Sequence, residues 1–393
     1  MKITKMEITT YKLNPDKGIP WNLLRIHTDE GIVGYGEPVL EGRAKTVKAA
    51  VEELGDYIIG KDPRQIERLW QDMFKGSFYS GGPILTSAVS GVEQALWDIT
   101  GKWYGVPVWK LMGGKVRNRI RMYAHVPPLK ADGTPAEQGK ATAEDYARGA
   151  VFRKEQGFNA VKTAGSVGPL RIIDTPETLI SIADRIGTIR DAVGWDMDIG
   201  IDCHGRFSPA MAKLFIKEVE QYKPMFIEEP VLPGNAESMM HISRMTHIPI
   251  ATGERLYTRW DFREIVEKRA AALLQPDVCH AGGILELRKI AAYGEVNECG
   301  LAPHNPMGAV ALAASFAVDA TTQNFVIQEH MTFGEGVLKE PFVMDADGYV
   351  PLPEKPGLGI EIDEESLAKL ALNTEGPHLP MYEDRDDGSF AHW

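Results

Sequence analysis

The chain carries the stretches Asp198-Ile-Gly-Ile-Asp202, Met225-Phe-Ile-Glu228 and Ile248-Pro-Ile-Ala-Thr-Gly-Glu254, three short apolar runs that each end on an acidic residue. The acidic ends Asp202, Glu228 and Glu254 follow one another at intervals of 26 residues. Apolar runs of this length between turn residues are typical of buried parallel strands. A period of about 25 residues for a strand and its return helix is the repeat of a (β/α)₈ barrel, whose chemistry gathers where the strands end.

The same repeat continues on both sides of these three runs. Downstream runs end at Asp277, His304 and Glu329, and upstream the ranges 158–162 and 119–123 supply two more, so eight strands are predicted. Helical apolar spacing fills the intervals, at 209–222, 236–246, 259–268 and 284–299. A doubly wound open sheet is the competing architecture, but it does not need eight similar units in succession. We therefore predict an α/β chain built on a TIM barrel.

The first part of the chain has a different pattern. Residues 3–11, 21–28 and 31–36 alternate like antiparallel strands, with Asp29-Glu-Gly31 as a hairpin signal, and helical patterns follow at 44–59, 63–74 and 83–104. A chain of 393 residues is also longer than one barrel of ordinary size. We predict an α+β capping domain at 1–118, the barrel at 119–341, and a C-terminal segment at 342–393 that returns to the capping domain.

Composition excludes several classes of partner. The formal net charge is −12 and there is no basic block, which argues against nucleic acid or an anionic membrane.

Cys203, Cys279 and Cys299 form no C-x-x-C pair, so reduced structural cysteines are expected. No apolar stretch approaches the length of a membrane span, and the N-terminus has no apolar signal region. We expect a cytoplasmic homo-oligomer that acts on a small molecule.

The three acidic strand ends predict a metal site. Carboxylates that converge at one end of a barrel require a hard cation, and Mg²⁺ is the best match to oxygen ligands. Glu229 adjoins Glu228, but the spacing selects Glu228, and successive strand residues point to opposite faces. Glu229 is then expected to be a structural partner of a nearby lysine or arginine.

Two histidines stand at strand ends near the predicted metal. His204 lies two residues beyond Asp202, so in an extended strand both side chains point the same way. It could be a fourth ligand, but Mg²⁺ prefers oxygen and proton transfer suits an imidazole better. His304 follows the seventh strand and has Asp277, after the sixth, as its neighbour in barrel order. A carboxylate that fixes the tautomer of His304 would make it a general base.

These residues together carry a family resemblance. The set resembles the sugar-acid dehydratases of the enolase superfamily, in the mandelate racemase-like group, where a histidine or lysine base works with Mg²⁺. Further matching motifs are 201–206 (IDCHGR), 226–231 (FIEEPV), 253–255 (GER), 274–277 (LQPD), 280–283 (HAGG), 36–43 (GEPVLEGR) and 355–363 (KPGLGIEID). The resemblance spans nearly the whole chain and implies an enolase-like, modified barrel with a capping domain.

The resemblance also implies roles. Asp202, Glu228 and Glu254 would bind Mg²⁺, His304 with Asp277 would remove the C2 proton of a D-aldonic acid, and His204 would protonate the departing 3-hydroxyl. Glu329 would hydrogen-bond the enolate oxygen, which requires a protonated carboxyl and hence a raised pKa. The expected substrate contacts are Trp21, Glu41, Arg43 and Lys162. The product would be a 2-keto-3-deoxy acid, with D-galactonate the first candidate substrate and D-gluconate the second.

Departures from family patterns narrow the choice of reaction and of substrate. Many members carry Lys-x-Lys on the second barrel strand, but here it reads Lys162-Thr-Ala164, which disfavours racemisation by two opposed bases. Mannonate dehydratases share the three ligands and lack the His304–Asp277 dyad. A mannonate or aldarate dehydratase remains an alternative. So does a non-catalytic sugar-acid-binding protein, whose mark would be the loss of a ligand or of the dyad.

Overall fold

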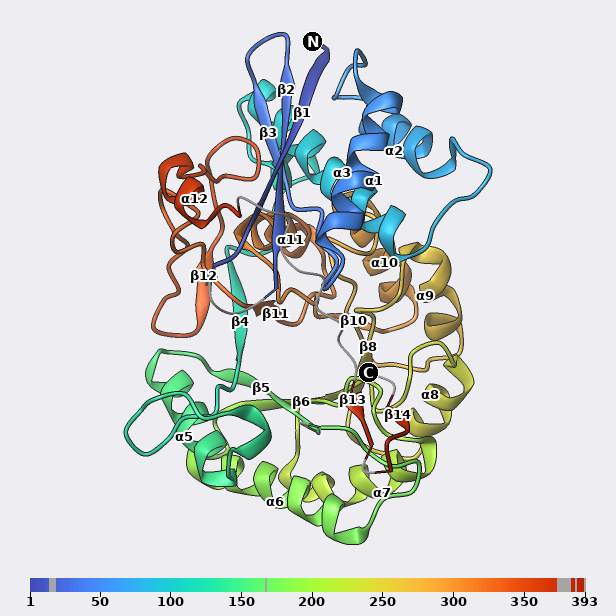
Figure 1. The fold of residues 1–393 in the computed structure, drawn as a ribbon, viewed down its shortest axis with the longest axis vertical. Coiled ribbons are helices and arrows are strands. Elements are labelled where there is room, and N and C mark those ends of the chain that lie inside the picture. The colour runs from blue at the N-terminus through green and yellow to red at the C-terminus, as the bar shows by residue number, and fades with distance from the viewer. Residues whose placement is uncertain (14–18, 167, 373–382, 386, 392–393) are drawn as a thin grey trace.

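A three-stranded antiparallel sheet begins the chain. The computed structural model describes residues 1–13, 19–166, 168–372, 383–385 and 387–391. Strands β1 (Ile3–Tyr11), β2 (Trp21–Thr28) and β3 (Val33–Gly36) pair in that order. Helices α1 (Ala44–Ile58) and α3 (Pro83–Tyr104) pack against the sheet, α2 (Ile66–Lys75) packs on these two helices, and α4 (Val108–Leu111) leads to the barrel. This unit forms the upper part of Figure 1.

Close packing of α3 on β3 depends on glycine. A Cβ built on Gly36 would lie 1.8 Å from the carbonyl oxygen of Gly91 in α3, a contact that no side chain could make. The helix is buried along most of its length, since it touches the sheet, α1, α2 and the barrel helix α10. It therefore forms the centre of the N-terminal unit and its junction with the barrel.

Eight parallel strands form the barrel, in the order β4 (Arg119–His125), β5 (Ala160–Ala164), β6 (Asp198–Asp202), β7 (Phe226–Glu228), β8 (Ile250–Thr252), β9 (Leu273–Leu274), β10 (Gly300–Leu301) and β11 (Gln328–His330). β11 pairs with β4. Leu301 completes the ring, because its N–H donates to Asn324 O and its carbonyl accepts from Val326 N, both at 2.8 Å. The predicted fold class is confirmed, although several strands are shorter than the apolar runs suggested.

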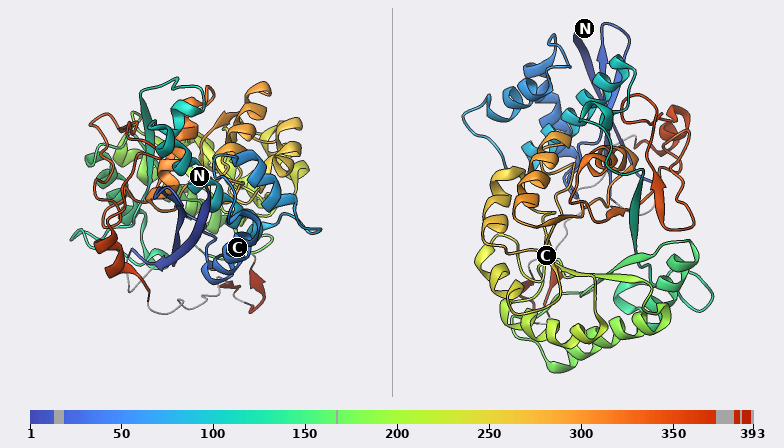
Figure 2. Two further views of the ribbon diagram at one scale, coloured as in Figure 1. Left: turned by 90° about the horizontal axis from the view of Figure 1, so that it is seen from above. Right: turned by 180° about the vertical axis from the view of Figure 1, so that it is seen from behind.

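Helices lie outside these strands and curve around them in Figures 1 and 2. They are α5 (Ala143–Glu155), α6 (Pro176–Val193), α7 (Pro209–Val219), α8 (Ala236–Ser243), α9 (Thr258–Glu267), α10 (Ile284–Val296) and α11 (Ala309–Thr321), with short 3₁₀ turns η1 (Gln138–Lys140) and η2 (Glu220–Tyr222). Within the described ranges, no barrel helix directly follows β11. None of the described helices is long and apolar enough to span a bilayer.

The inside of the barrel is filled by one layer of side chains, namely Tyr123, Ala160, Phe226, Ala251, Leu273, Ala302 and Ile327. The ring of Phe226 faces Gly200 of β6, where a Cβ would approach it to 2.6 Å. Tyr123 packs edge-on against Phe226, with ring centroids 6.1 Å apart. The layer closes the barrel beneath the strand ends, so polar side chains that follow it along the strands meet above an apolar floor.

The C-terminal part touches both units. β12 (Tyr349–Pro351) pairs antiparallel with β4, whereas α12 (Glu364–Leu370) lies beside the N-terminal sheet through ion pairing of Glu364 with Arg25. The hairpin of β13 (Glu383–Asp384) and β14 (Phe390–Ala391) instead contacts the loop after β5, where Arg385 Nε donates to Leu170 O at 3.0 Å. The domain boundaries at 118 and 341 stay predictions.

Candidate active site

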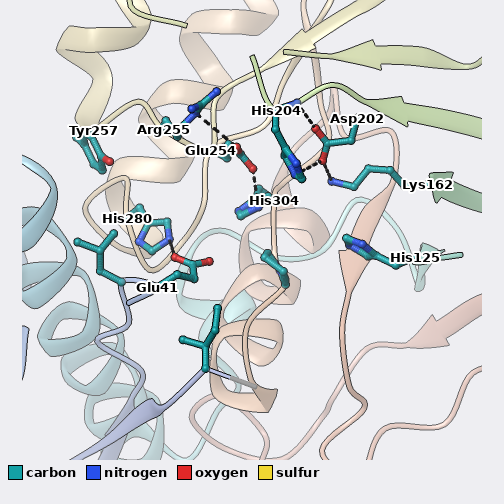
Figure 3. Close-up of a pocket in the computed structure, with 13 residues that line it drawn as sticks. Glu41, His125, Lys162, Asp202, His204, Glu254, Arg255, Tyr257, His280 and His304 are labelled. Atoms are coloured by element: carbon teal, nitrogen blue, oxygen red, sulfur yellow. Dashed lines mark hydrogen bonds and ion pairs between the residues drawn. The ribbon is translucent and has the colours of Figure 1, made fainter. Parts of the chain in front are cut away.

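A cavity of about 380 Å³ opens where the barrel strands end and the N-terminal unit covers them (Figure 3). Acidic, basic and aromatic side chains from both units line it: Ile19, Leu40, Glu41, His125, Lys162, Asp202, His204, Glu254, Arg255, Tyr257, His280, His304 and Pro306. A concave site with convergent polar groups is the usual form of a small-molecule site. Four residues predicted to bind the metal or transfer protons, Asp202, His204, Glu254 and His304, therefore meet at this cavity.

Lys162 lies among the carboxylates of the strand ends. Its Nζ is 3.0 Å from Asp202 Oδ2, 2.9 Å from Glu228 Oε2 and 2.8 Å from Glu329 Oε1. All four side chains are buried. Burial lowers the pKa of Lys162, but the three carboxylates outweigh it and raise the pKa well above the usual value, so the side chain is an ammonium.

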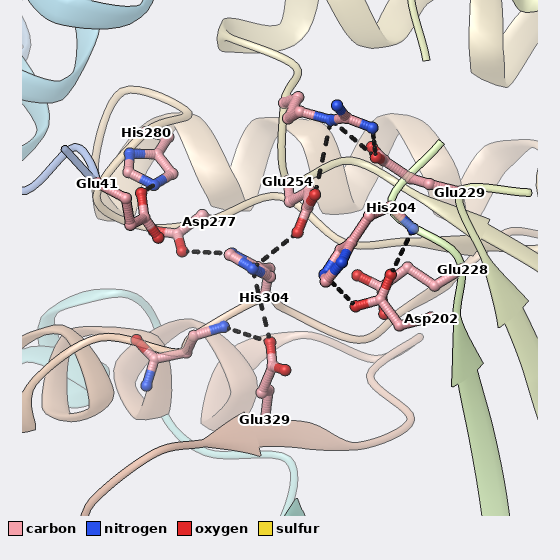
Figure 4. Close-up of polar contacts among 12 residues, drawn as sticks. Glu41, Asp202, His204, Glu228, Glu229, Glu254, Asp277, His280, His304 and Glu329 are labelled. Atoms are coloured by element: carbon pink, nitrogen blue, oxygen red, sulfur yellow. Dashed lines mark hydrogen bonds and ion pairs between the residues drawn. The ribbon is translucent and has the colours of Figure 1, made fainter. Parts of the chain in front are cut away.

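Glu254 lies between an arginine and a histidine. Its Oε1 is 3.6 Å from Arg255 Nε and its Oε2 is 2.9 Å from His304 Nε2 (Figure 4). Glu229, which follows Glu228 in the chain, does not join the carboxylates around Lys162. Arg255 Nε instead donates to Glu229 Oε2 at 2.8 Å. The expectation that Glu229 pairs with a nearby cationic side chain is confirmed.

The acidic cluster has the chemistry of a cation site. Burial and then Asp202 raise the pKa of Glu228 to about 7, and its Oε1 is buried without a partner among the described residues. Donor atoms of Asp202, His204 and Glu254 come within 4.8 Å of one another. Several carboxylate oxygens, one of them without a partner in the described part of the chain, fit a hard divalent cation.

His304 and Asp277 form the expected pair. His304 Nδ1 lies 2.7 Å from Asp277 Oδ2, and the two residues make a parallel bridge between the ends of their strands. Asp277 is itself fixed, because its Oδ1 accepts from Cys279 N at 2.6 Å. Burial lowers the pKa of His304, but Glu329, Glu254 and Asp277 raise it well above the usual value. With Nδ1 on Asp277, Nε2 is the nitrogen directed toward Glu254 and the cavity.

His204 reaches the cluster by a different backbone than predicted. β6 ends at Asp202, and His204 has a φ of +49°, so the extended strand assumed from the sequence is wrong at this residue. The turn still puts Nε2 of His204 3.1 Å from Asp202 Oδ2, and its backbone N–H caps Asp202 Oδ1 at 3.0 Å. Burial lowers the pKa of the imidazole, but Asp202 reverses this and raises it to about 9.

Glu329 differs from expectation in its protonation. Burial would raise its pKa, yet the positive charges of Lys162 and His304 and a hydrogen bond from His125 hold the pKa well below the usual value. Its Oε1 is 2.6 Å from His125 Nε2, and its Oε2 accepts from Asn305 N at 2.8 Å. The raised pKa predicted for Glu329 is therefore wrong for this arrangement. The cationic donor beside the Glu329 carboxylate is Lys162, and His125 contacts the same carboxylate.

Of the four expected substrate contacts, only Glu41 and Lys162 line the cavity. Trp21 is not among the lining residues, since its side chain is 8% exposed and packs edge-on against Tyr11, and its contact with substrate stays a prediction. Arg43 is exposed at the start of α1, outside the cavity lining. A loop position in the sequence did not reveal which side chains turn toward the barrel.

The lining residues that the sequence left without a role include three with polar side chains, His125, Tyr257 and His280. His125 ends β4, and its position at a strand end was the signal that could have identified it. Tyr257 and His280 lie in loops after β8 and β9, three residues beyond Glu254 and Asp277 respectively. No periodicity marks such loop residues, so only the tertiary arrangement shows that they face the cavity.

Comparison with known proteins agrees with this geometry. Residues 145–366 match the family model described as Enolase C-terminal domain-like, and residues 15–113 match the Mandelate racemase / muconate lactonizing enzyme, N-terminal domain. D-galactonate dehydratase of Cronobacter sakazakii is 46% identical over the full length of both chains.

Solved structures agree over nearly the whole chain. A mandelate racemase/muconate lactonizing enzyme-like protein from Roseovarius sp. TM1035 superposes with a TM-score of 0.90 at 34% identity, covering 98% of this chain and 99% of its own. A member of the enolase superfamily from Salmonella Typhimurium gives 0.86 at 33% identity, covering 94% and 98%. The chain belongs to the enolase superfamily, in its mandelate racemase / muconate lactonizing enzyme group.

Proposed function

We propose that this member of the enolase superfamily is a hydro-lyase that dehydrates a D-aldonic acid to a 2-keto-3-deoxy acid. The observation that carries the proposal is the His304–Asp277 pair, which faces the acidic cluster across one cavity. D-galactonate is the first candidate substrate, because the relative that is 46% identical over its full length bears that name. The retained dyad and carboxylates argue against a non-catalytic binding protein.

Asp202, Glu228 and Glu254 would hold Mg²⁺ in this proposal. Their oxygens, including Glu228 Oε1, for which the described residues offer no hydrogen-bond partner, are the hard donors that this ion prefers. When bound, the ion supplies positive charge that stabilises the anion formed when a proton leaves the carbon next to a carboxylate. His204 is less suited to be a ligand, because Mg²⁺ prefers oxygen to imidazole nitrogen.

The two histidines divide the proton transfers. The base is the neutral form of His304, whose Nε2 takes the proton from C2 while Asp277 on Nδ1 fixes the tautomer in which Nε2 can accept it. His204 then protonates the 3-hydroxyl, so that the C3–O bond breaks and water leaves. Burial lowers the pKa of this imidazole but Asp202 raises it overall, and the protonated form is the one that acts as the acid. The enol that remains tautomerises to the 2-keto-3-deoxy acid.

Lys162 and Glu329 complete the proposed site. The ammonium of Lys162 is the cationic donor beside Glu329, so it can meet negative charge that develops on the substrate. Glu329 acts by orienting Lys162 and His125, to which it lies within 2.8 and 2.6 Å. This role replaces the direct donation by a protonated Glu329 that the resemblance implied.

A panel of sugar acids tests the proposed function. The purified protein with Mg²⁺ should release a 2-keto acid from one or more D-aldonates, with D-galactonate before D-gluconate, and the product should be lighter by one water. Turnover of mannonate or a diacid alone would favour the alternative dehydratases. Binding of a sugar acid without any turnover would favour the non-catalytic alternative.

A further inference from the structure

Two barrel helices begin without a cap of their own. Helices α5 to α8 each follow a residue whose side chain accepts the backbone N–H of the third helical residue, namely Thr142, Thr175, Ser208 and Asn235. Helices α10 and α11 instead follow Gly283 and Gly308, which have no side chain for this bond. These two helices come after β9 and β10, in the same strand–helix units as Asp277 and His304.

Carboxylates of the N-terminal unit take the place of the missing caps. Glu37, directly after β3, accepts at Oε2 from the N–H of Ala311, the third residue of α11, at 2.9 Å. Glu93, in α3, accepts from the first two backbone N–H groups of α10, at 2.7 and 2.9 Å. A negatively charged acceptor stabilises a helix start, where backbone N–H groups lack partners within the helix. The N-terminal unit therefore completes the starts of α10 and α11.

Glycine at both helix starts makes room for these carboxylates. A Cβ built on Gly308 would lie 2.0 Å from Glu37 Oε1, and one built on Gly283 would lie 2.1 Å from Glu93 Oε2. Both glutamates are fully buried, and burying a carboxylate costs free energy that a serine or asparagine at position 308 would not require. The capping of α11 alone does not explain why its acceptor comes from the other unit.

Glu37 is also linked to the segment that carries Asp277. The backbone N–H of Glu37 donates to Gln94 Oε1 at 2.9 Å, and Gln94 Nε2 donates to Val278 O at 3.1 Å. Gln94 is fully buried, and Val278 directly follows Asp277 in the chain. One buried chain of hydrogen bonds therefore joins the residue after Asp277 to the start of α11, the helix that follows His304.

The geometry of the proposed base depends on how these two segments are held. His304 Nδ1 lies 2.7 Å from Asp277 Oδ2, although the two side chains come from different strand–helix units (Figure 4). Gln94 holds the backbone directly after Asp277. Glu37 holds the first turn of the helix after His304. Because a displacement of about 1 Å in a catalytic group can lower a rate by about 100-fold, a tie between the two segments acts on the proton transfer.

We propose that Glu37 and Gln94 are positioning residues for the base, because they tie the segment after Asp277 to the helix after His304. The inference rests on the proposed function, in which the His304–Asp277 pair removes the C2 proton. It goes beyond that function by making the docked N-terminal unit part of the geometry of the base. Glu37 and Gln94 are buried and do not line the cavity, so their effect passes through the pair.

Replacing Glu37 by Met tests the tie. Met has a similar length but cannot accept from Ala311 N, so the start of α11 should shift. We expect kcat for 2-keto acid release from the best D-aldonate to fall by roughly 10- to 100-fold, with a much smaller change in the calorimetric Kd of that substrate. Gln94→Met breaks the link to Val278 O and should act in the same way. Glu37→Gln should retain most of the activity, because its amide oxygen can accept from Ala311 N while its NH₂ donates to the Tyr11 hydroxyl.

A spectroscopic measurement reports on the pair without any turnover. In protein that contains ¹⁵N-labelled histidine, the proton on His304 Nδ1 should give a downfield NMR resonance, because it lies in a short hydrogen bond to a carboxylate. The resonance is assigned by its loss in Asp277→Asn. It should move upfield or broaden in Glu37→Met and in Gln94→Met, and it should be retained in Glu37→Gln.

The matched control is Glu93→Gln. Both oxygens of Glu93 accept from α10, so an amide here leaves one of those N–H groups without its acceptor, as Glu37→Met does at α11. The contacts of Glu93 lie at the start of α10 and on Trp97 rather than at the residue after Asp277. This control should lose stability in thermal unfolding but keep both kcat and the His304 resonance.

The outcomes separate this inference from the proposed function. If the wild type releases no 2-keto acid from any sugar acid, the proposed function fails, while the His304 resonance still tests the tie. An unchanged resonance or an unchanged kcat in folded Glu37→Met overturns the tie, and if Glu37→Met does not fold, the same result in Gln94→Met overturns it. Equal losses in Glu93→Gln, or a loss of binding as large as that of kcat, would show a general loosening of the site and would also overturn it.

Discussion

Replacing Asp277 by Asn should impair catalysis through the tautomer of His304. Asp277 uses both oxygens, since Oδ1 accepts from Cys279 N at 2.6 Å and Oδ2 lies 2.7 Å from His304 Nδ1. In Asp277→Asn the amide oxygen must serve the Cys279 N–H, because the amide NH₂ cannot accept. The NH₂ then faces Nδ1 and forces the proton of the imidazole onto Nε2, the nitrogen that should receive the C2 proton.

The expected loss of kcat follows from this reversed tautomer of His304. The same substitution behind a histidine base in serine proteases lowers kcat by about 10⁴-fold while the geometry stays intact, and we expect a loss of roughly 10³- to 10⁴-fold here. The assay is the kcat for 2-keto acid release from the best sugar acid, with calorimetric substrate binding measured in parallel. Binding should change far less than kcat, because Asp277 lies behind His304 and is not itself among the residues that line the cavity.

A control keeps the test specific. Asp196→Asn removes a carboxylate that pairs with Lys154 on the surface, where the side chain is 73% exposed, and should leave kcat unchanged. Retention of more than a tenth of wild-type kcat in a folded Asp277→Asn protein would refute the tautomer argument. Equal losses in kcat and in binding would also count against it, because they would point to a general disturbance of the site.

Two further predictions concern the metal and the junction of the two units. Chelation should abolish turnover and Mg²⁺ restore it, and Glu254→Gln should weaken Mg²⁺ binding in calorimetry far more than Glu229→Gln; equal effects would mean that the wrong acid of the Glu228–Glu229 pair was chosen. Burial raises the pKa of Glu93 from 4.5 to about 8, although it accepts from Ile284 N and Leu285 N at 2.7 and 2.9 Å. Between pH 5 and 8 Glu93 stays protonated in the folded protein but ionises in the unfolded chain. The contribution of Glu93 to the free energy of unfolding should therefore fall by about 1.4 kcal/mol for each pH unit in this range. Thermal melts should show a smaller decline over this range in Glu93→Gln, and an identical pH dependence would contradict the assignment.

The barrel could be predicted because its signal is periodic. Each strand is an apolar run with a polar end, and equal spacing of Asp202, Glu228 and Glu254 places those ends at one face without knowledge of any contact. The pair of Asp277 and His304 followed from strand order alone, since neighbouring parallel strands end side by side. The local sequence pattern therefore predicted the strands, and the order of the strands predicted where these residues lie.

The rest of the site depends on tertiary packing that leaves no local pattern. Trp21 begins a strand whose first side chain turns into the core, and nothing in the sequence distinguishes that from a turn toward the cavity. The left-handed backbone of His204 was missed because an extended strand gives the same approximate direction. The low pKa of Glu329 could not be foreseen either, because it depends on how closely Lys162 and His304 approach.

Exchange of the C2 hydrogen with D₂O tests the central claim most directly. The substrate is a sugar-acid analogue that lacks the 3-hydroxyl, so elimination cannot compete, and exchange is followed by NMR with Mg²⁺ present. The account predicts exchange in the wild type, none in His304→Asn, and some remaining in His204→Asn, which in turn should block dehydration of the complete substrate. Exchange that survives in His304→Asn and vanishes in His204→Asn would contradict it, because the base and the acid would then be reversed.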